Sequence, residues 1–301
     1  MSRIGFIFIC ALYITVSILS FARGLSVEVQ LITCGIFVLL VGIPHGAIDH
    51  ILYLQESKVK PTLFFTNYLL SMAAYILLWI VFPAFSLILF LFLSAYHFGE
   101  SQLAGMIKSK PYRIISFLIW GTNILSGLIY YNHGELINIF SSYSDLEVLK
   151  PILNDKIHLL ILIATSAIII IFSIIVFRKH LFKLETIGKE IYILGLIHIA
   201  FYILPVIPAF TIYFVILHSI KVLVDEYSFL KTYNVQFNIL KFIKELIPFT
   251  LLSFIGGIFL FLMIKFQILN MSYVLLSIIL ISIITLPHSL VMQKFYQPKK
   301  C

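Results

Sequence analysis

Long, uninterrupted apolar blocks dominate this sequence and constrain its fold more than any other feature. Each block holds about 17 to 25 residues, and the run from Leu159 to Phe177 is continuous and rich in Ile and Leu. A helix of about 20 residues crosses the roughly 30 Å hydrocarbon core of a bilayer. A membrane barrel would instead show short segments of alternating polarity. The pattern therefore predicts transmembrane helices.

The composition agrees with a membrane protein. Of 301 residues, 61% are hydrophobic and 11% are charged, so a water-soluble globule of this size would lack the polar surface to cover itself. The formal net charge is +8, but the basic residues lie in short clusters between apolar blocks, which argues against nucleic-acid binding. Cys10, Cys34 and Cys301 form no CxxC pair and are interpreted as packing residues rather than disulfide partners or zinc ligands.

We predict an all-α, polytopic transmembrane bundle of about ten spans (eight to ten), forming one integral membrane domain over residues 1–301. Met1 to Ala22 is interpreted as the first span and not as a signal peptide, because no small-residue cleavage site follows it. The longest connection, His133 to Lys156, is expected to include a short amphipathic helix at the membrane interface. The predicted spans are residues 4–22, 26–54, 63–83, 85–105, 113–131, 157–177, 190–205, 207–228, 244–267 and 272–292.

The distribution of Lys and Arg predicts the orientation. Even-numbered spans end at basic clusters, whereas odd-numbered spans end in connections with few net positive charges; the weakest contrasts are at Arg23 and at the mixed loop ending at Lys156. Because cytoplasmic connections carry the excess of positive charge, both termini are predicted to be cytoplasmic, in the inner (plasma) membrane of a cell. The basic residues concerned are Lys58, Lys60, Lys108, Lys110, Arg113, Arg178, Lys179, Lys183, Lys221, Lys231, Lys294, Lys299 and Lys300.

Nine histidines are present, and five lie inside predicted spans at a similar depth. His45 and His50 are near the end of the second span, His97 is in the later half of the fourth, His218 is in the middle of the eighth, and His288 is near the end of the tenth. These four spans run toward the predicted cytoplasmic side, so their histidines fall in the same half of the membrane. We expect them to converge.

Convergence would give the histidines a common chemical role. Ionisable groups within a bilayer are costly and usually face the bundle interior with partners. For one histidine, a hydrogen bond between helices is the simpler explanation; for four helices at one depth, shared metal ligation is favoured. Imidazole suits iron, copper, zinc or nickel, and a histidine set leaves positions open for substrate or oxygen. Iron for oxygen chemistry is therefore a candidate.

Carboxylates near these histidines are candidates for orienting them, because a ligating imidazole usually donates its second N–H to such a group. Asp49 follows His45 by four residues and Glu100 follows His97 by three, so each pair shares a helical face. For Glu100, the alternative is a solvated helix end near the interface. The remaining acidic candidates are Asp225 and Glu226, two turns after His218.

His45 and His50 are not expected to act alike. Five residues correspond to roughly 140° around a regular helix, so the two rings would face different directions, although Pro44 and Gly46 could bend this segment. His45 is the preferred ligand, and His50 is a second candidate for which a structural hydrogen bond is favoured. His198 is a possible neighbour of the site, although the favoured interpretation is a histidine that makes hydrogen bonds within the bundle and has no role in the site. His133, His158 and His180 lie in connections or at span ends and are assigned no chemistry.

Four histidine-containing strings together resemble the Brp/Blh family of bacterial and archaeal membrane proteins. The resemblance runs from the second span to the last, and the family's histidines fall on His45, His97, His218 and His288, while His50 matches the histidine that closes the first motif. The strings are GIPHGAIDH (Gly42 to His50), SAYHFGES (Ser94 to Ser101), FVILHS (Phe214 to Ser219) and TLPHSLV (Thr285 to Val291).

The resemblance implies a multi-span Fe(2+) enzyme that cleaves the central double bond of beta-carotene with molecular oxygen. The product is retinal, two molecules per carotene, often made to supply a rhodopsin. A long polyene dissolves in the membrane lipid, and a pocket lined by some of the 28 Phe and 16 Tyr would suit it.

One departure from the family pattern concerns the later helix, where a second histidine is expected one turn after His218. This chain has Val222 there, and valine cannot bind a metal. His288 or His198 would then complete a set of four ligands, or the protein binds iron poorly or has another activity.

Two further classes of function stay open. The pair His45 and His50 has the form of one histidine box of a two-iron desaturase or hydroxylase, although no His-x2-His-His string is present. A transporter, or a degenerate carotenoid-binding protein without cleavage activity, would use the histidines for proton transfer or helix pairing. Lys221 and Val222 favour this last class.

Overall fold

The structure is a computed structural model that describes residues 3–21, 25–55, 57–107 and 110–297. Within these residues the protein is helical and has no strand. Several residues used in the sequence analysis lie outside the described ranges: Arg23, Lys108, Lys299, Lys300 and Cys301. The α-helices are α1 (Arg3–Phe21), α2 (Val27–Phe37), α3 (Asp49–Gln55), α4 (Pro61–Val81), α5 (Pro83–Leu103), α6 (Lys110–Tyr131), α7 (His133–Ser142), α8 (Asp155–Arg178), α9 (Leu184–Ile203), α10 (Val206–Ile212), α11 (Ile220–Tyr233), α12 (Ile239–Lys265) and α13 (Tyr273–Phe295).

Nine helical stretches in the described part of the chain are long and apolar enough to cross a membrane. They confirm the predicted polytopic helical fold and correspond to the second to tenth predicted spans. The first predicted span is α1, a 19-residue helix whose apolar part, Gly5–Ser20, is shorter. The nine stretches are Val27–Gln55, Pro61–Val81, Pro83–Leu103, Tyr112–Tyr131, Asp155–Arg178, Leu184–Ile203, Val206–Tyr233, Ile239–Lys265 and Tyr273–Phe295.

Two helices begin earlier than their apolar residues indicate. α9 starts at Leu184 instead of residue 190, and α12 starts at Ile239 instead of residue 244. Both extensions contain Lys or Glu, which a helix tolerates where it leaves the hydrocarbon core. Apolar length therefore underestimates the length of these helices.

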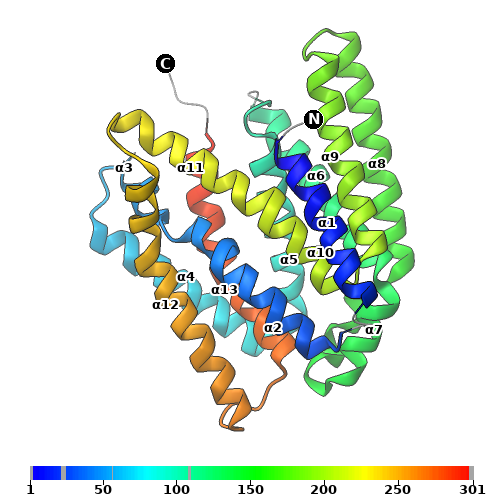
Figure 1. Cartoon of the computed structure of the whole chain (residues 1–301), viewed down its shortest axis with the longest axis vertical. Coiled ribbons are helices and arrows are strands. Elements are labelled where there is room, and N and C mark those ends of the chain that lie inside the picture. Colours follow the sequence, from blue (N-terminus) through cyan, green and yellow to red (C-terminus); the bar gives the residue numbers. More distant parts are fainter. Residues whose placement is uncertain (1–2, 22–24, 56, 108–109, 298–301) are drawn as a thin grey trace.

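The bundle has a central group of helices between two flanking groups (Figure 1). α6, α8 and α9 form one flank, and α3, α4 and α12 form the other. Helix α5 packs closely on α6 and also against α13, while α13 contacts α4. The two helices α5 and α13, which carry His97 and His288, therefore lie side by side in the interior.

Glycines allow α5 and α6 to touch backbone to backbone. An added Cβ on Gly99 would lie 1.9 Å from the carbonyl oxygen of Phe117, and one on Gly121 would lie 1.8 Å from that of Ala95. Close approach through small residues is a common way for membrane helices to pack, since lipid offers no hydrophobic driving force between them. Gly99 thus has a packing role within the SAYHFGES string.

Two of the histidine-bearing spans are interrupted by irregular turns. In the second span, a π-helical turn, η1 (Val38–Gly42), leads into a 3₁₀ segment, η2 (Ile43–Gly46), that contains Pro44 and His45. In the eighth span, the π-helical turn η4 (Tyr213–Ser219) contains His218. The segment around Pro44 and Gly46 is thus not a regular α-helix, in line with the interruption that these two residues could cause. Such turns are frequent at functional sites because they re-aim side chains within a helix.

The longest connection contains helix α7 as expected, followed by a 3₁₀ helix, η3 (Ser144–Leu153). Glu135 accepts a hydrogen bond of 2.8 Å from the amide of Val206, the first residue of α10. Asp145 accepts one of 2.6 Å from the amide of Ser272, which precedes α13. Both carboxylates satisfy amides at helix N-termini. The connection thereby holds the starts of the two spans that lead to His218 and His288.

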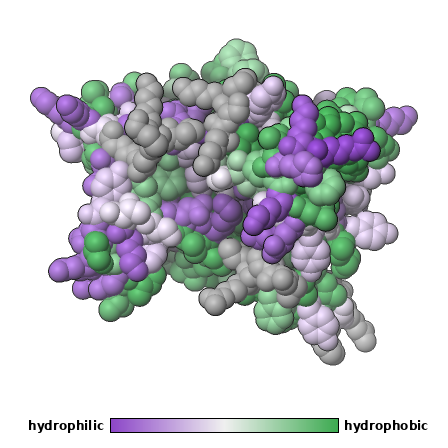
Figure 2. Space-filling view, turned by 90° about the horizontal axis from the view of Figure 1, so that it is seen from above, coloured by the Kyte–Doolittle hydropathy of each residue, from purple (hydrophilic) through white to green (hydrophobic). Residues whose placement is uncertain are grey.

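Several of the predicted cytoplasmic connections lie at one end of the bundle. The start of α1, the turn between α8 and α9, and the ends of α11 and α13 all lie toward the top of Figure 1. Seen from this end, hydrophilic residues cover much of the surface, including a group near its centre (Figure 2). The arrangement agrees with termini on one side of the membrane. The identity of that side stays a prediction.

The contact between α5 and α6 predicts that Gly99→Ala destabilises the protein. The methyl group would meet a backbone carbonyl that cannot rotate away, so the helices must separate, at a cost of at least about 1–3 kcal/mol. We expect a lower melting temperature in detergent. Gly195→Ala is the control, because an added Cβ there has no described atom within 4 Å. Equal melting temperatures for the two variants would contradict the packing role.

Candidate metal centre

The four histidines expected to converge do so in the interior of the bundle. His45 comes from η2, His97 from α5, His218 from η4 and His288 from α13. Their exposed fractions are 6%, 2%, 2% and 3%. The predicted convergence of the four histidines in the interior of the bundle is confirmed.

The four rings surround a common space. His45 and His97 are nearly parallel, with centroids 6.3 Å apart. His288 stands roughly perpendicular to both, 4.7 Å from His45 and 4.8 Å from His97. His218 is likewise perpendicular to both, at 5.1 Å and 4.8 Å. The rings of His45 and His97 are therefore nearly parallel, and each lies close to the roughly perpendicular rings of His218 and His288.

Three of the histidines meet a metal-site criterion directly. One nitrogen each from His45, His97 and His288 lies within 4.8 Å of the other two. Two ligands on opposite sides of one ion, with bonds of about 2.1 Å, would be about 4.2 Å apart. The set is thus slightly wider than a closed site. His218 contacts two of these rings, but its nitrogens fall outside this set.

Hydrogen bonds occupy one nitrogen of three of the rings. His288 Nδ1 is 2.9 Å from Asp49 Oδ1, His45 Nδ1 contacts the carbonyl oxygen of Gly42, and His218 Nδ1 is 3.0 Å from the hydroxyl of Ser101. Carboxylate and carbonyl oxygens only accept, so Nδ1 of His288 and His45 carries the proton.

The remaining nitrogens include several that lack a partner. Nε2 of His218, Nε2 of His288 and both nitrogens of His97 are buried and have no hydrogen-bond partner among the described residues. A buried polar atom without a partner is rare in a folded protein and calls for an explanation. Four imidazoles around one space, three of them with unpartnered buried nitrogens, fit a divalent first-row metal such as ferrous iron.

Asp49 orients a histidine as expected, but not the one on its own helix. Its carboxylate binds His288 of α13 and also accepts a 3.0 Å hydrogen bond from the hydroxyl of Tyr68. His45 turns to the Gly42 carbonyl instead, because the 3₁₀ segment breaks the regular spacing between His45 and Asp49.

Glu100 is neither a partner of His97 nor a solvated helix end. It is 1% exposed, so the solvated alternative is wrong. One carboxylate oxygen accepts a 3.1 Å hydrogen bond from Tyr96, and the other has no partner among the described residues.

The secondary histidines lie away from the cluster. The ring of His50 packs against Phe65 and Phe249, 5.6 Å and 4.9 Å away between centroids, so it diverges from His45 as the 140° angle predicts. His198 Nε2 is 2.9 Å from the amide oxygen of Asn123. Its Nδ1 is buried and has no partner among the described residues, and His198 is not part of the three-histidine set.

Position 222 faces an apolar part of the core. Val222 is 0% exposed and belongs to a cluster that includes Ile48, Leu52 and Met292. One turn later, Glu226 is also 0% exposed, and neither of its carboxylate oxygens has a partner among the described residues. Asp225 instead pairs with Lys221 at 3.1 Å.

Three contributors to the site were not singled out from the sequence: Gly42, Tyr68 and Ser101. Ser101 follows His97 by four residues, so it shares the helical face of that histidine. Gly42 precedes His45 by one helical turn. These spacings could have indicated both residues, whereas no local signal links Tyr68 to Asp49.

The fold and the site define a polytopic helical membrane protein with a buried four-histidine cluster. The sequence profile of the family described as beta-carotene 15,15'-dioxygenase matches residues 36–296, which include all four histidines. This chain belongs to that family, as the histidine motifs indicated.

A curated relative shares part of the sequence. It is the beta-carotene 15,15'-dioxygenase of the uncultured marine bacterium 66A03, 30% identical over 188 residues. The alignment covers 60% of this chain and 64% of that protein. No solved structure matches this chain.

The cluster predicts which histidines a bound metal requires. His45→Ala, His97→Ala and His288→Ala should each reduce Fe2+ affinity at least 100-fold, since each removes a nitrogen of the three-histidine set. Metal per chain, measured after loading the detergent-purified protein with Fe2+ without oxygen, checks this. His50→Ala and His198→Ala are the controls and should bind as the wild type does. Two irons per chain, or retention of iron by the first three variants, would contradict a single centre here.

Proposed function

We propose that this protein cleaves beta-carotene at its central double bond with molecular oxygen, giving two molecules of retinal. The metal would be ferrous iron held by His45, His97, His218 and His288. The observation that carries the proposal is a group of buried histidines with unpartnered nitrogens, inside a membrane bundle of the beta-carotene 15,15'-dioxygenase family. In the reaction, one carbon–carbon double bond breaks, and each carbon takes one atom of the same O2.

The residues of the site support this chemistry in distinct ways. Iron bound to histidine supplies the one-electron chemistry that oxygen requires before it reacts with an alkene. Asp49 and the Gly42 carbonyl hold protons on Nδ1 of His288 and His45, which leaves Nε2 of each ring as the ligand atom. The burial of all four rings excludes bulk water.

Aromatic side chains next to the histidines offer a surface for a polyene. The ring of Phe214 stacks on His218 with centroids 5.5 Å apart and meets His45 edge-on at 5.7 Å. Phe98 lies 4.8 Å from His218 and 5.2 Å from Tyr213. Flat aromatic rings pack well against a rigid conjugated chain. We assign this wall the role of orienting the substrate, which would reach it from the lipid.

One apolar cavity of the described structure lies away from the cluster. It has a volume of about 200 Å³ and is lined by residues of α5, α6, α8 and α9, such as Leu103, Trp120 and Ile169, and by none of the four histidines.

The two-iron alternative has little support in the geometry. His45 and His50 diverge, and the described residues contain one group of three potential ligands. Carotenoid binding without cleavage is the stronger alternative, because Val222 replaces the second histidine of the family pattern.

Expression in bacteria that accumulate beta-carotene tests cleavage against binding. We expect retinal to form and the carotene to disappear, as followed by chromatography, and His97→Ala to abolish retinal formation. His50→Ala is the matched control and should retain activity. Intact carotene bound to iron-loaded wild-type protein would contradict the enzyme and favour a binding protein.

We further propose that both termini lie in the cytoplasm, with the protein in the inner (plasma) membrane. A reporter that fluoresces in the cytoplasm but not outside it, fused after residue 301, should be bright. An alkaline phosphatase fused there should be inactive, since it folds on the outer side. The opposite pair of results would invert the predicted orientation.

A further inference from the structure

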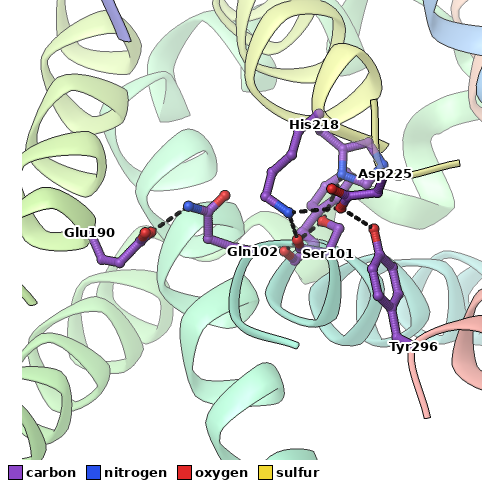
Figure 3. A network of polar contacts seen from close by, with 8 residues as sticks. Ser101, Gln102, Glu190, His218, Asp225 and Tyr296 are labelled. Atoms are coloured by element: carbon purple, nitrogen blue, oxygen red, sulfur yellow. Dashed lines mark hydrogen bonds and ion pairs between the residues drawn. The ribbon is translucent and has the colours of Figure 1, made fainter. Parts of the chain in front are cut away.

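A chain of polar contacts links His218 to neighbouring helices. Figure 3 shows Ser101 of α5 beside His218, Asp225 of α11 and Tyr296, which follows α13. The adjacent Gln102 extends the contacts to Glu190 of α9. The helices that carry His97, His218 and His288 are therefore joined on one side of the cluster.

The hydroxyl of Ser101 has two neighbours and one proton. It lies 3.0 Å from the carbonyl oxygen of Phe98 and 3.0 Å from Nδ1 of His218. The carbonyl can only accept, so it takes the hydroxyl proton. The Ser101 oxygen then accepts a hydrogen bond from Nδ1–H of His218. In that tautomer, the lone pair of His218 is on Nε2, the buried nitrogen without a described partner.

Further contacts fix the backbone of Ser101. The Lys221 ammonium donates to the Ser101 carbonyl oxygen and pairs with Asp225 at 3.1 Å. The Tyr296 hydroxyl donates to the same Asp225 oxygen at 3.0 Å, and the Tyr296 carbonyl accepts a 2.6 Å bond from Arg113. Burial and the neighbouring Asp225 carboxylate raise the pKa of the Tyr296 phenol well above its ordinary value, so this hydroxyl stays a donor.

We propose that Ser101 is the positioning residue of His218: its hydroxyl accepts the Nδ1 proton and thereby directs Nε2 of His218 to the metal as a fourth ligand. The inference rests on the proposed iron site and deepens it. Because Val222 cannot supply a second histidine on this helix, the set of four depends on His218 keeping this orientation.

The other rings show why His218 needs such support. His288 is held by a carboxylate and His45 by a carbonyl, which cannot donate to Nδ1 and so leave one tautomer. A serine hydroxyl can donate or accept, so its direction is set by its surroundings. The Phe98 carbonyl accepts the hydroxyl proton of Ser101, and Lys221 holds the backbone of Ser101 in place.

The tautomer of His218 can be measured in the metal-free protein. Nitrogen NMR of protein labelled with ¹⁵N-histidine distinguishes a protonated from an unprotonated ring nitrogen, and His218→Gln identifies the signal. We expect Nδ1–H in the wild type and in Ser101→Thr, and a mixture or Nε2–H in Ser101→Ala. Nε2–H in the wild type would overturn the proposal.

Metal binding provides the second test, with Co2+ and Fe2+ alone as probes. Ser101→Ala should weaken binding about 10- to 100-fold and lower the intensity of the Co2+ absorption bands, whereas Ser101→Thr should restore both. Ser86→Ala is the matched control, because Ser86 is a buried serine of the same helix whose hydroxyl also bonds a helical carbonyl, at 3.0 Å from Phe82. Melting temperatures of all variants separate loss of the site from loss of the fold.

The outcomes distinguish this inference from the proposed function. If the wild type binds metal through His45 and His97, but Ser101→Ala binds as tightly and with the same Co2+ spectrum, the role of Ser101 is wrong and the iron site stands. If the wild type binds neither metal, the proposed function and the role of Ser101 both fail.

Discussion

The structure depends on placing four imidazoles in an apolar membrane interior and giving three of them, His45, His218 and His288, a hydrogen-bond partner at Nδ1. A charged ring without a counter-charge is costly there, and so is an N–H without a partner. Asp49, the Gly42 carbonyl and Ser101 each contact one Nδ1 atom. Two of these contacts join different spans, so the same bonds that place the protons also hold helices together. The same hydrogen bonds therefore position the histidine rings and contribute to the packing of the bundle.

Regular helices alone would not bring these rings to a common space. The π-helical turn that contains His218 and the π-to-3₁₀ transition before His45 rotate both side chains relative to an uninterrupted α-helix. In contrast, His97 lies in a continuous helix, α5, whose position is set by the glycine contact with α6 at Gly99 and Gly121. Irregular backbone thus adjusts two ligand candidates to a third that close packing has fixed.

Much of this arrangement could be predicted from the sequence, because hydrocarbon thickness sets span length and the basic connections order the spans by direction. Depth along each span then placed His45, His97, His218 and His288 at one level, and helical geometry correctly separated His50 from His45. The partners were harder. Asp49 was matched to the histidine on its own helix, yet it binds His288, which lies 239 residues away. The local sequence carries no signal for which helices pack together or for how η2 orients His45. The burial of Glu100 likewise depends on the tertiary structure.

Charge balance extends the argument beyond the ligands. Four neutral imidazoles would leave the charge of a ferrous ion uncompensated, and a cation in a low-dielectric interior needs negative groups nearby. Buried carboxylates are present where the proposed site requires them. Asp49 bonds directly to His288, and Asp49 acts electrostatically on Glu226, which is fully buried with both oxygens lacking a described partner. Such carboxylates are hard to explain in an apolar bundle without a cation, a proton or water. Val222 lies between His218 and Glu226 along one helical face, so the buried Glu226 carboxylate stands two turns from His218, with an apolar side chain in between.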